Sequence, residues 1–79
     1  MLTKQQAMSL THGDILHHVK LRGSDNLPVR VRVSGRCVTW KTRPAEWRLP
    51  VKWGLYRSLD INQTNACLWC VPGEENNHV

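Results

Sequence analysis

The chain has 79 residues, of which 41% are hydrophobic and 22% charged, and its formal net charge is +5. This composition is near the globular average and excludes a disordered or fibrous chain, and the length predicts one domain with a modest core. No run of about 18 apolar residues is present, so no membrane-spanning helix is expected. The first ten residues lack the apolar run of a signal peptide, and three cysteines, an odd number, argue against a secreted disulfide scaffold. We therefore expect a cytoplasmic protein with reduced thiols and no membrane partner.

Positive charge is concentrated in the middle of the chain. Ten of the eleven Lys and Arg residues lie between Lys20 and Arg57, where only Asp25 and Glu46 are acidic. The rest of the chain carries a net negative charge. This asymmetry is typical of a protein with an anionic partner, most often nucleic acid, although a basic surface also serves solubility and acidic protein partners.

Residues 1–12 are predicted to form a short helix and a lead-in to the remaining chain. Thr3 and Gln6 have the spacing of a capping box, in which each side chain satisfies an exposed backbone N–H group of the first turn. The helix is expected to run over about residues 4–10. Gly13 is expected to end it, because glycine takes the left-handed conformation without a Cβ clash.

Two strands are predicted on either side of the turn "RGSDNLP". In the first, "DILHHVKL", the adjacent His17 and His18 point to opposite faces, so one is expected to be packed and the other exposed. In the second, Val29, Val31 and Val33 share one face of the strand. Arg30 and Arg32 share the other face.

A change in the alternation occurs at Gly35. Beyond it the apolar positions are Val38 and Trp40, which have the opposite parity to Val31 and Val33. A bulge at Gly35 keeps the apolar side inward, so one long bent strand is predicted.

The segment "WRLPVKWG" predicts the next strand. Trp47, Leu49, Val51 and Trp53 form its predicted core face. Pro50 cannot donate a ladder hydrogen bond, so this strand is expected to lie at an edge or to have one unpaired side there. Gly54 then allows a kink before the strand "LYRSLDI".

The last segments complete a mainly β fold. "NQTNACLWC" predicts a helical turn, "CVP" a short closing strand, and residues 73–79 a flexible acidic tail. Over residues 13–72 the elements predict a small, curved antiparallel barrel of four or five strands.

This layout resembles SH3-like barrels, in which a hinged long strand precedes a hairpin and a late helical turn precedes the closing strand. The phrases "HGDILHH", "VSGRC", "WKTRP" and "RLPVKWGL" look like those of a family of small uncharacterised proteins carried by phages and mobile elements. The resemblance covers residues 13–72 and implies an SH3-like fold. SH3-like barrels bind peptides, nucleic acids or other proteins, and a few form oligomeric enzymes, so the resemblance implies no single activity.

Eight residues are candidates for binding nucleic acid, because they combine cationic side chains with one aromatic ring in the predicted sheet and its turns. They are Arg30, Arg32, Arg36, Lys41, Arg43, Arg48, Lys52 and Tyr56. A planar guanidinium grips phosphate with two hydrogen bonds or stacks on a base. The alternative is a solvated face, since outward strand positions must be polar and basic stems shield apolar surface.

If Trp40 pairs with Trp47 across the turn "KTRPAE", the two strand faces that carry the basic residues become continuous. Trp40, Tyr56 and Trp69 are expected to be freer than the aromatic residues of the core face, and two of them could flank a groove for a peptide or an unpaired base.

Cys67 and Cys70, in "CLWC", have a spacing that offers two sulfurs to one metal ion. Two further ligands from Cys37 or the histidines would complete a zinc site, but no second paired motif is present. The alternative is that the cysteines are small buried hydrophobes beside Trp69. No metal site and no cofactor are predicted.

No phosphate loop, nucleophile elbow or carboxylate pair is present, so no catalytic residue is assigned and the chain is not expected to be an enzyme. The predicted function is a small non-enzymatic binding module for nucleic acid. The alternatives are a module that binds an acidic protein or assembles with itself as a homo-oligomer, and a small metal-binding protein that uses Cys67 and Cys70.

Overall fold

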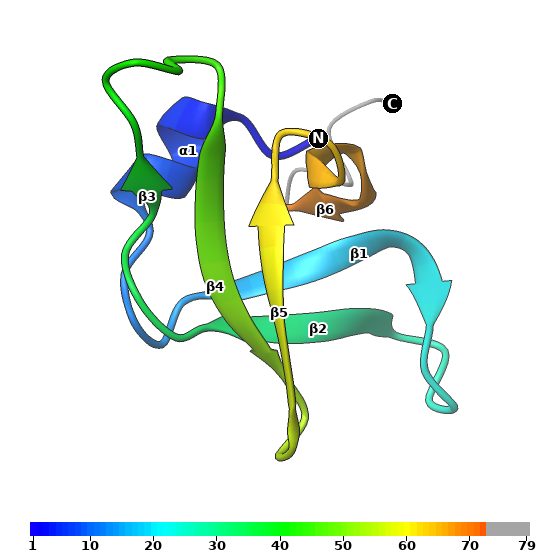
Figure 1. The fold of residues 1–79 in the computed structure, drawn as a ribbon. Helices are drawn as coiled ribbons and strands as arrows, with labels where there is room; N and C mark the ends of the chain where they lie inside the picture. The colour runs from blue at the N-terminus through cyan, green and yellow to red at the C-terminus, as the bar shows by residue number, and fades with distance from the viewer. Residues whose placement is uncertain (73–79) are drawn as a thin grey trace.

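The computed structural model describes residues 1–72 and confirms a mainly β fold (Figure 1). Six strands form one antiparallel sheet: β1 (Ile15–Arg22), β2 (Pro28–Val33), β3 (Val38–Thr39), β4 (Trp47–Trp53), β5 (Arg57–Asn62) and β6 (Trp69–Cys70). The helix α1 (Lys4–Ser9) precedes the sheet, and the 3-10 helix η1 (Ala66–Leu68) precedes β6. The sheet curls into a half-barrel in which β1 and β2 cross the direction of β4 and β5. The predicted tail over residues 73–79 lies outside the described residues.

Strand β4 joins the two parts of the sheet, because it pairs with three other strands. One edge pairs with β5 along the whole strand. The other edge pairs first with β3, where Val38 lies opposite Arg48, and then with β2, where Arg32 lies opposite Lys52. On the far side of β2 follow β1 and then β6. This register places Arg32 beside Lys52, which is twenty residues later in the chain.

The core lies on the concave side of the curled sheet. It consists of the buried residues Leu2, Ala7, Leu16, Val31, Val33, Trp47, Leu49, Val51, Ile61, Ala66 and Trp69. Strand alternation explains most of these positions, since Val31, Val33, Leu49 and Val51 are the inward residues of β2 and β4. The backbone N–H of Leu2 donates to the Ala66 carbonyl at 3.1 Å, which ties the start of the chain to η1.

Helix α1 begins with the predicted capping box. The Thr3 hydroxyl accepts from the Gln6 N–H at 3.1 Å, and the Gln6 Oε1 accepts from the Thr3 N–H at 3.0 Å. The prediction that Gly13 ends the helix is wrong, because α1 ends at Ser9 and its C-cap, Leu10, is extended. Gly13 has a φ of +99° in the following turn, where its N–H donates to the Val33 carbonyl at 2.8 Å.

The predicted long strand is divided in two. Strand β2 ends at Val33, residues 34–37 form a link, and β3 begins at Val38. The link does bend the chain at Gly35, where an added Cβ would lie only 3.2 Å from Pro50 Cγ. The predicted inward parity of Val38 is wrong, since this side chain is 44% exposed and Cys37 packs against the core instead. Alternation cannot be extrapolated across the link because its residues are not in a strand.

Pro50 does not lie in an edge strand. The alternative prediction, that one side of the strand is unpaired at Pro50, agrees with the register. Its carbonyl accepts from the Ser34 N–H at 2.9 Å, so the backbone polar groups of Pro50 face the link between β2 and β3. The missing N–H of the proline therefore falls where the ladder is already interrupted.

His18 stabilises an irregularity in β1. The register shifts between the pair His17 and Arg30 and the pair Arg22 and Pro28, so β1 bulges between them. The Nδ1 atom of His18 accepts from the backbone N–H groups of Lys20 at 3.1 Å and Leu21 at 3.0 Å. Burial, and secondarily the charge of Lys20, lower the pKa of His18. His18 is thus the packed histidine that alternation predicted, whereas His17 is half-buried rather than exposed.

The free edge of β5 is partly covered by a side chain. The Asn65 Oδ1 accepts from the Asn62 N–H at 2.8 Å, and the Asn65 Nδ2 donates to the Asp60 carbonyl at 3.1 Å. These two contacts use backbone groups that point away from β4.

Candidate functional site

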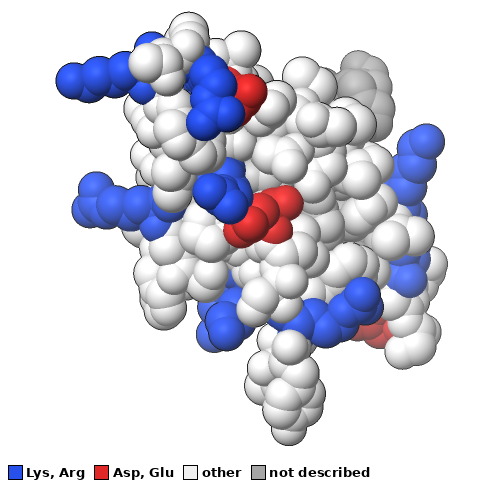
Figure 2. Space-filling model, viewed as in Figure 1, with Lys and Arg blue, Asp and Glu red and all other residues white. Residues whose placement is uncertain are grey.

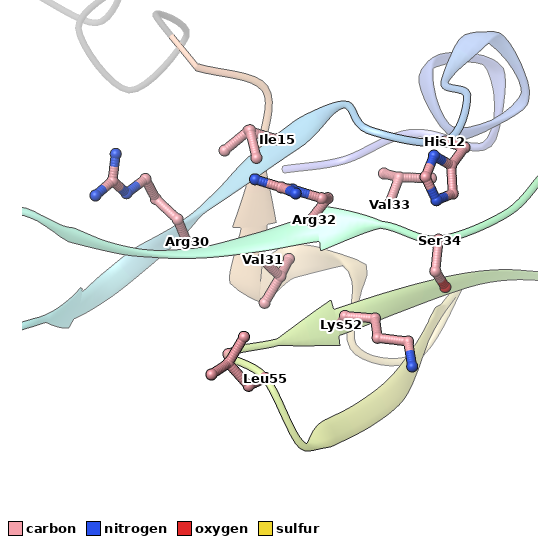
Figure 3. Close-up of a pocket in the computed structure, with 10 residues that line it drawn as sticks. His12, Ile15, Arg30, Val31, Arg32, Val33, Ser34, Lys52 and Leu55 are labelled. Atoms are coloured by element: carbon pink, nitrogen blue, oxygen red, sulfur yellow. The ribbon is translucent and has the colours of Figure 1, made fainter.

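A groove of about 650 Å³ lies beside β2, where β2 and β4 diverge toward the β4–β5 turn (Figure 3). Ten residues from the lead-in, three strands, the link after β2 and this turn line it: His12, Ile15, Arg30, Val31, Arg32, Val33, Ser34, Lys52, Gly54 and Leu55. Arg30 and Arg32 extend from the same side of β2, while Lys52 comes from β4. We call this site the basic groove.

Strand alternation and register assemble the cations of the basic groove. Because Val31 and Val33 are buried, Arg30 and Arg32 must point to the opposite, exposed face of β2. Arg32 lies opposite Lys52 across the β2–β4 ladder and opposite Ile15 across the β1–β2 ladder. Neighbouring strands are about 4.8 Å apart, so three cationic residues arise from a small area of backbone.

These three cations have no countercharge within residues 1–72. None of the described residues forms an ion pair with Arg30, Arg32 or Lys52, and the lining of the groove contains no acidic side chain. Like charges directly opposite each other destabilise a sheet. The local charge of the groove is therefore positive and is not neutralised by the part of the chain that the structure describes.

The other predicted arginines of the sheet lie in a different environment, which we call the Trp40 cluster: Trp40, Arg43, Glu46, Arg48 and Asp60. The Arg43 and Arg48 guanidinium carbons lie 5.1 and 5.6 Å from the centre of the Trp40 ring. Arg43 pairs with Glu46 at 3.1 Å, and Arg48 pairs with Asp60 at 3.6 Å. In Figure 2, acidic groups accordingly lie directly against cationic ones over the β3–β4 turn and over the middle of β4 and β5. These arginines are already partnered.

The remaining predicted residues lie outside both sites. Arg36 is exposed in the link between β2 and β3, and Lys41 is exposed in the β3–β4 turn. Tyr56 is 94% exposed in the β4–β5 turn, next to Leu55 of the groove. Of the eight predicted residues, only Arg30, Arg32 and Lys52 therefore lie together in one groove.

The predicted pairing of two tryptophans is wrong by one residue. Thr39, not Trp40, lies opposite Trp47, and Trp40 follows the end of β3. Trp69 was expected to be free but is 3% exposed, because it packs edge-on against His18 at 4.9 Å and Trp53 at 5.9 Å between ring centres. Among the three freer candidates, Tyr56 alone is fully exposed.

Seven of the ten residues that line the basic groove were not predicted as site residues: His12, Ile15, Val31, Val33, Ser34, Gly54 and Leu55. His12 reaches the groove because the turn after α1 is fixed to the end of β2, where the Val33 N–H also donates to the Asp14 carbonyl at 2.8 Å. No periodic pattern in the sequence predicts such a contact between an irregular segment and a distant strand. Leu55 had one usable signal, since a leucine after Gly54 in a hairpin turn projects from the sheet.

The three cysteines differ in their exposure to solvent. Cys67 is exposed, whereas Cys70 is buried and its thiol donates to the His17 carbonyl at 3.5 Å. Burial raises the pKa of the Cys37 thiol, which lies beside the core. Within residues 1–72, no three His, Cys, Asp or Glu side chains come together in a way that could hold a metal ion.

Within the described part of the chain, no helix has the length and apolar character needed to cross a bilayer. Comparisons with protein-family models, with curated proteins and with solved structures found no significant match.

Proposed function

We propose that the chain is a non-enzymatic module that binds nucleic acid through the basic groove. The observation that carries this proposal is the position of Arg32 opposite Lys52, with Arg30 beside them and no countercharge among residues 1–72. A pair of opposed like charges costs the fold about 0.2–1 kcal/mol. A bound phosphate chain offsets that cost because it places negative charge between the cations.

The cationic side chains of the groove suit phosphate. Each guanidinium donates two parallel hydrogen bonds to a phosphate, and the lysine adds a point charge. The lining contains no carboxylate or thiol, and His12 and Ser34 are its imidazole and its hydroxyl. Of its apolar members, Ile15 and Leu55 are not buried, and they provide contact area without competing for the cations.

The salt dependence of binding tests the proposal. Three phosphate contacts predict that log K falls with log salt with a slope of about −2 for a single strand and about −2.7 for a duplex. Replacing Arg30, Arg32 or Lys52 singly by Ala should make the single-strand slope shallower by about 0.7 each. Absence of binding to either form at low salt would exclude this function.

A second candidate is self-association through the outer half of the β1–β2 hairpin. Here Val19, Leu21 and Leu27 are exposed apolar residues beyond the bulge at His18. Sedimentation at increasing concentration measures the oligomeric state, and Leu21→Ser should dissociate such an oligomer. A monomer over the whole concentration range excludes this candidate.

A further inference from the structure

We infer that the basic groove takes a single strand in preference to a duplex, because Tyr56, which follows the groove residue Leu55 in the chain, presents an exposed stacking surface for an unpaired base. This inference rests on the proposed function and specifies the class of nucleic acid.

Tyr56 lies in the β4–β5 turn, directly after the groove residue Leu55. Trp53 and Arg57 are the last paired residues of the two strands, and Gly54, with a φ of +73°, starts the turn between them. Leu55 lines the groove and is 85% exposed, and Tyr56 follows it directly with 94% exposure. The turn projects from the sheet as the lowest part of the molecule in Figure 1.

The base of the turn is fixed to the core, while its tip is not. The Arg57 guanidinium carbon lies 5.3 Å from the centre of the Trp53 ring, and Trp53 packs edge-on against the buried Trp69 at 5.9 Å. These contacts fix the two residues, Trp53 and Arg57, between which the turn with Tyr56 is suspended. The phenol ring itself remains almost entirely in solvent, so a ligand can cover both of its faces.

Base stacking distinguishes single strands from duplexes at this position. In a duplex the base faces already stack on one another, so the tyrosine gains no partner when the phosphates occupy the groove. In a single strand every base offers a π-face, and stacking on an aromatic side chain is tolerant of sequence. Phosphate contacts at Arg30, Arg32 and Lys52 then position the strand, and Tyr56 selects for the unpaired base.

Three probes of equal length separate stacking from phosphate binding; the two single strands also have equal charge, whereas the duplex has about twice as many phosphates. They are an oligothymidylate of about ten nucleotides, within the usual range of site sizes, the abasic strand of the same length, and a duplex of that length. We expect Tyr56→Ala to weaken binding of the oligothymidylate by about 5- to 150-fold and to leave the other two affinities unchanged. Tyr56→Phe is the matched control, because it keeps the ring, and should bind all three probes as the unaltered chain does.

The outcomes separate this inference from the proposed function. If the unaltered chain binds the probes but Tyr56→Ala has no effect, or weakens all three equally, the stacking role is wrong and phosphate binding by the groove remains. Tighter binding of the duplex than of the oligothymidylate also overturns the inference. If none of the probes binds at low salt, both proposals fail. Circular dichroism of the variants confirms that the fold is kept, as expected for a side chain that is 94% exposed.

Discussion

The basic groove and the Trp40 cluster use the same strand but treat their cations in opposite ways. Lys52 and Arg48 both lie on the exposed face of β4. Lys52 lies opposite Arg32, whereas Arg48 reaches Asp60 and the Trp40 ring. The difference shows that the cross-strand neighbour, rather than the local density of positive charge, decides whether a basic residue is available to a ligand.

The largest expected effect contrasts two charge reversals of equal size. Arg30→Glu combined with Arg32→Glu should weaken nucleic-acid binding by roughly 100-fold or more, because two charge-assisted contacts are lost. Arg43→Glu combined with Arg48→Glu changes the net charge by the same amount and should weaken binding far less. Fluorescence anisotropy with a labelled oligonucleotide measures both. Equal losses would show that net charge alone, and not the basic groove, drives binding.

A smaller effect is expected on stability, where the half-buried Trp40 and the exposed Tyr56 should differ. Trp40→Ala should lower the free energy of unfolding by about 1–3 kcal/mol, because it removes two cation–π contacts and part of the packing. Tyr56→Ala should change it by less than about 0.5 kcal/mol. Urea titrations followed by circular dichroism measure both values. A large loss for Tyr56→Ala would mean that the tyrosine is part of the packing and not free to bind.

The third prediction is that removing a positive charge changes the free energy of unfolding in opposite directions at Lys52 and at Arg48. Lys52→Gln should raise the free energy of unfolding by about 0.2–1 kcal/mol, because the opposed charges on β2 and β4 are relieved. Arg48→Gln should lower it by about 0.5–2 kcal/mol, because the exposed ion pair to Asp60 and the contact with Trp40 are lost. Urea titrations of both variants at low salt test the sign. A decrease for Lys52→Gln would contradict the unbalanced charge of the groove.

The last prediction concerns pH. Because the pKa of His18 is lowered in the folded chain, the unfolded chain binds this proton first as the pH falls below about 6.5. The contribution of His18 to stability is therefore complete above that pH and decreases below it. His18→Asn keeps an acceptor for the backbone N–H groups of the bulge and removes the titration. The difference in unfolding free energy between the two chains should diminish from pH 7.5 to pH 5, and a constant difference would exclude this role.

The alternation of residues predicted the cations of the groove but not their surroundings. Val31 and Val33 fixed the exposed face of Arg30 and Arg32, since a strand with one buried face allows only one orientation. The pairing of Arg32 with Lys52 depends on how residues 34–37 leave β2, and no period describes such a link. Val38 was misplaced for the same reason.

The availability of each cation could not be predicted from its own segment. Asp60 neutralises Arg48 because β5 pairs with β4 in a register that depends on the three residues of the turn at Gly54. The burial of Trp69 likewise depends on β6 pairing with β1, more than fifty residues earlier in the chain. Long-range pairing of this kind is decided by packing rather than by local preference.

The two hydrogen bonds of the Asn65 side chain affect how readily the free edge of β5 can pair with a strand of another molecule. Its carboxamide supplies one donor and one acceptor in the place where a neighbouring strand would supply them. A strand from another molecule must displace this amide before it can extend the sheet along β5. A single side chain thus protects part of the free edge of this open sheet against edge-to-edge aggregation.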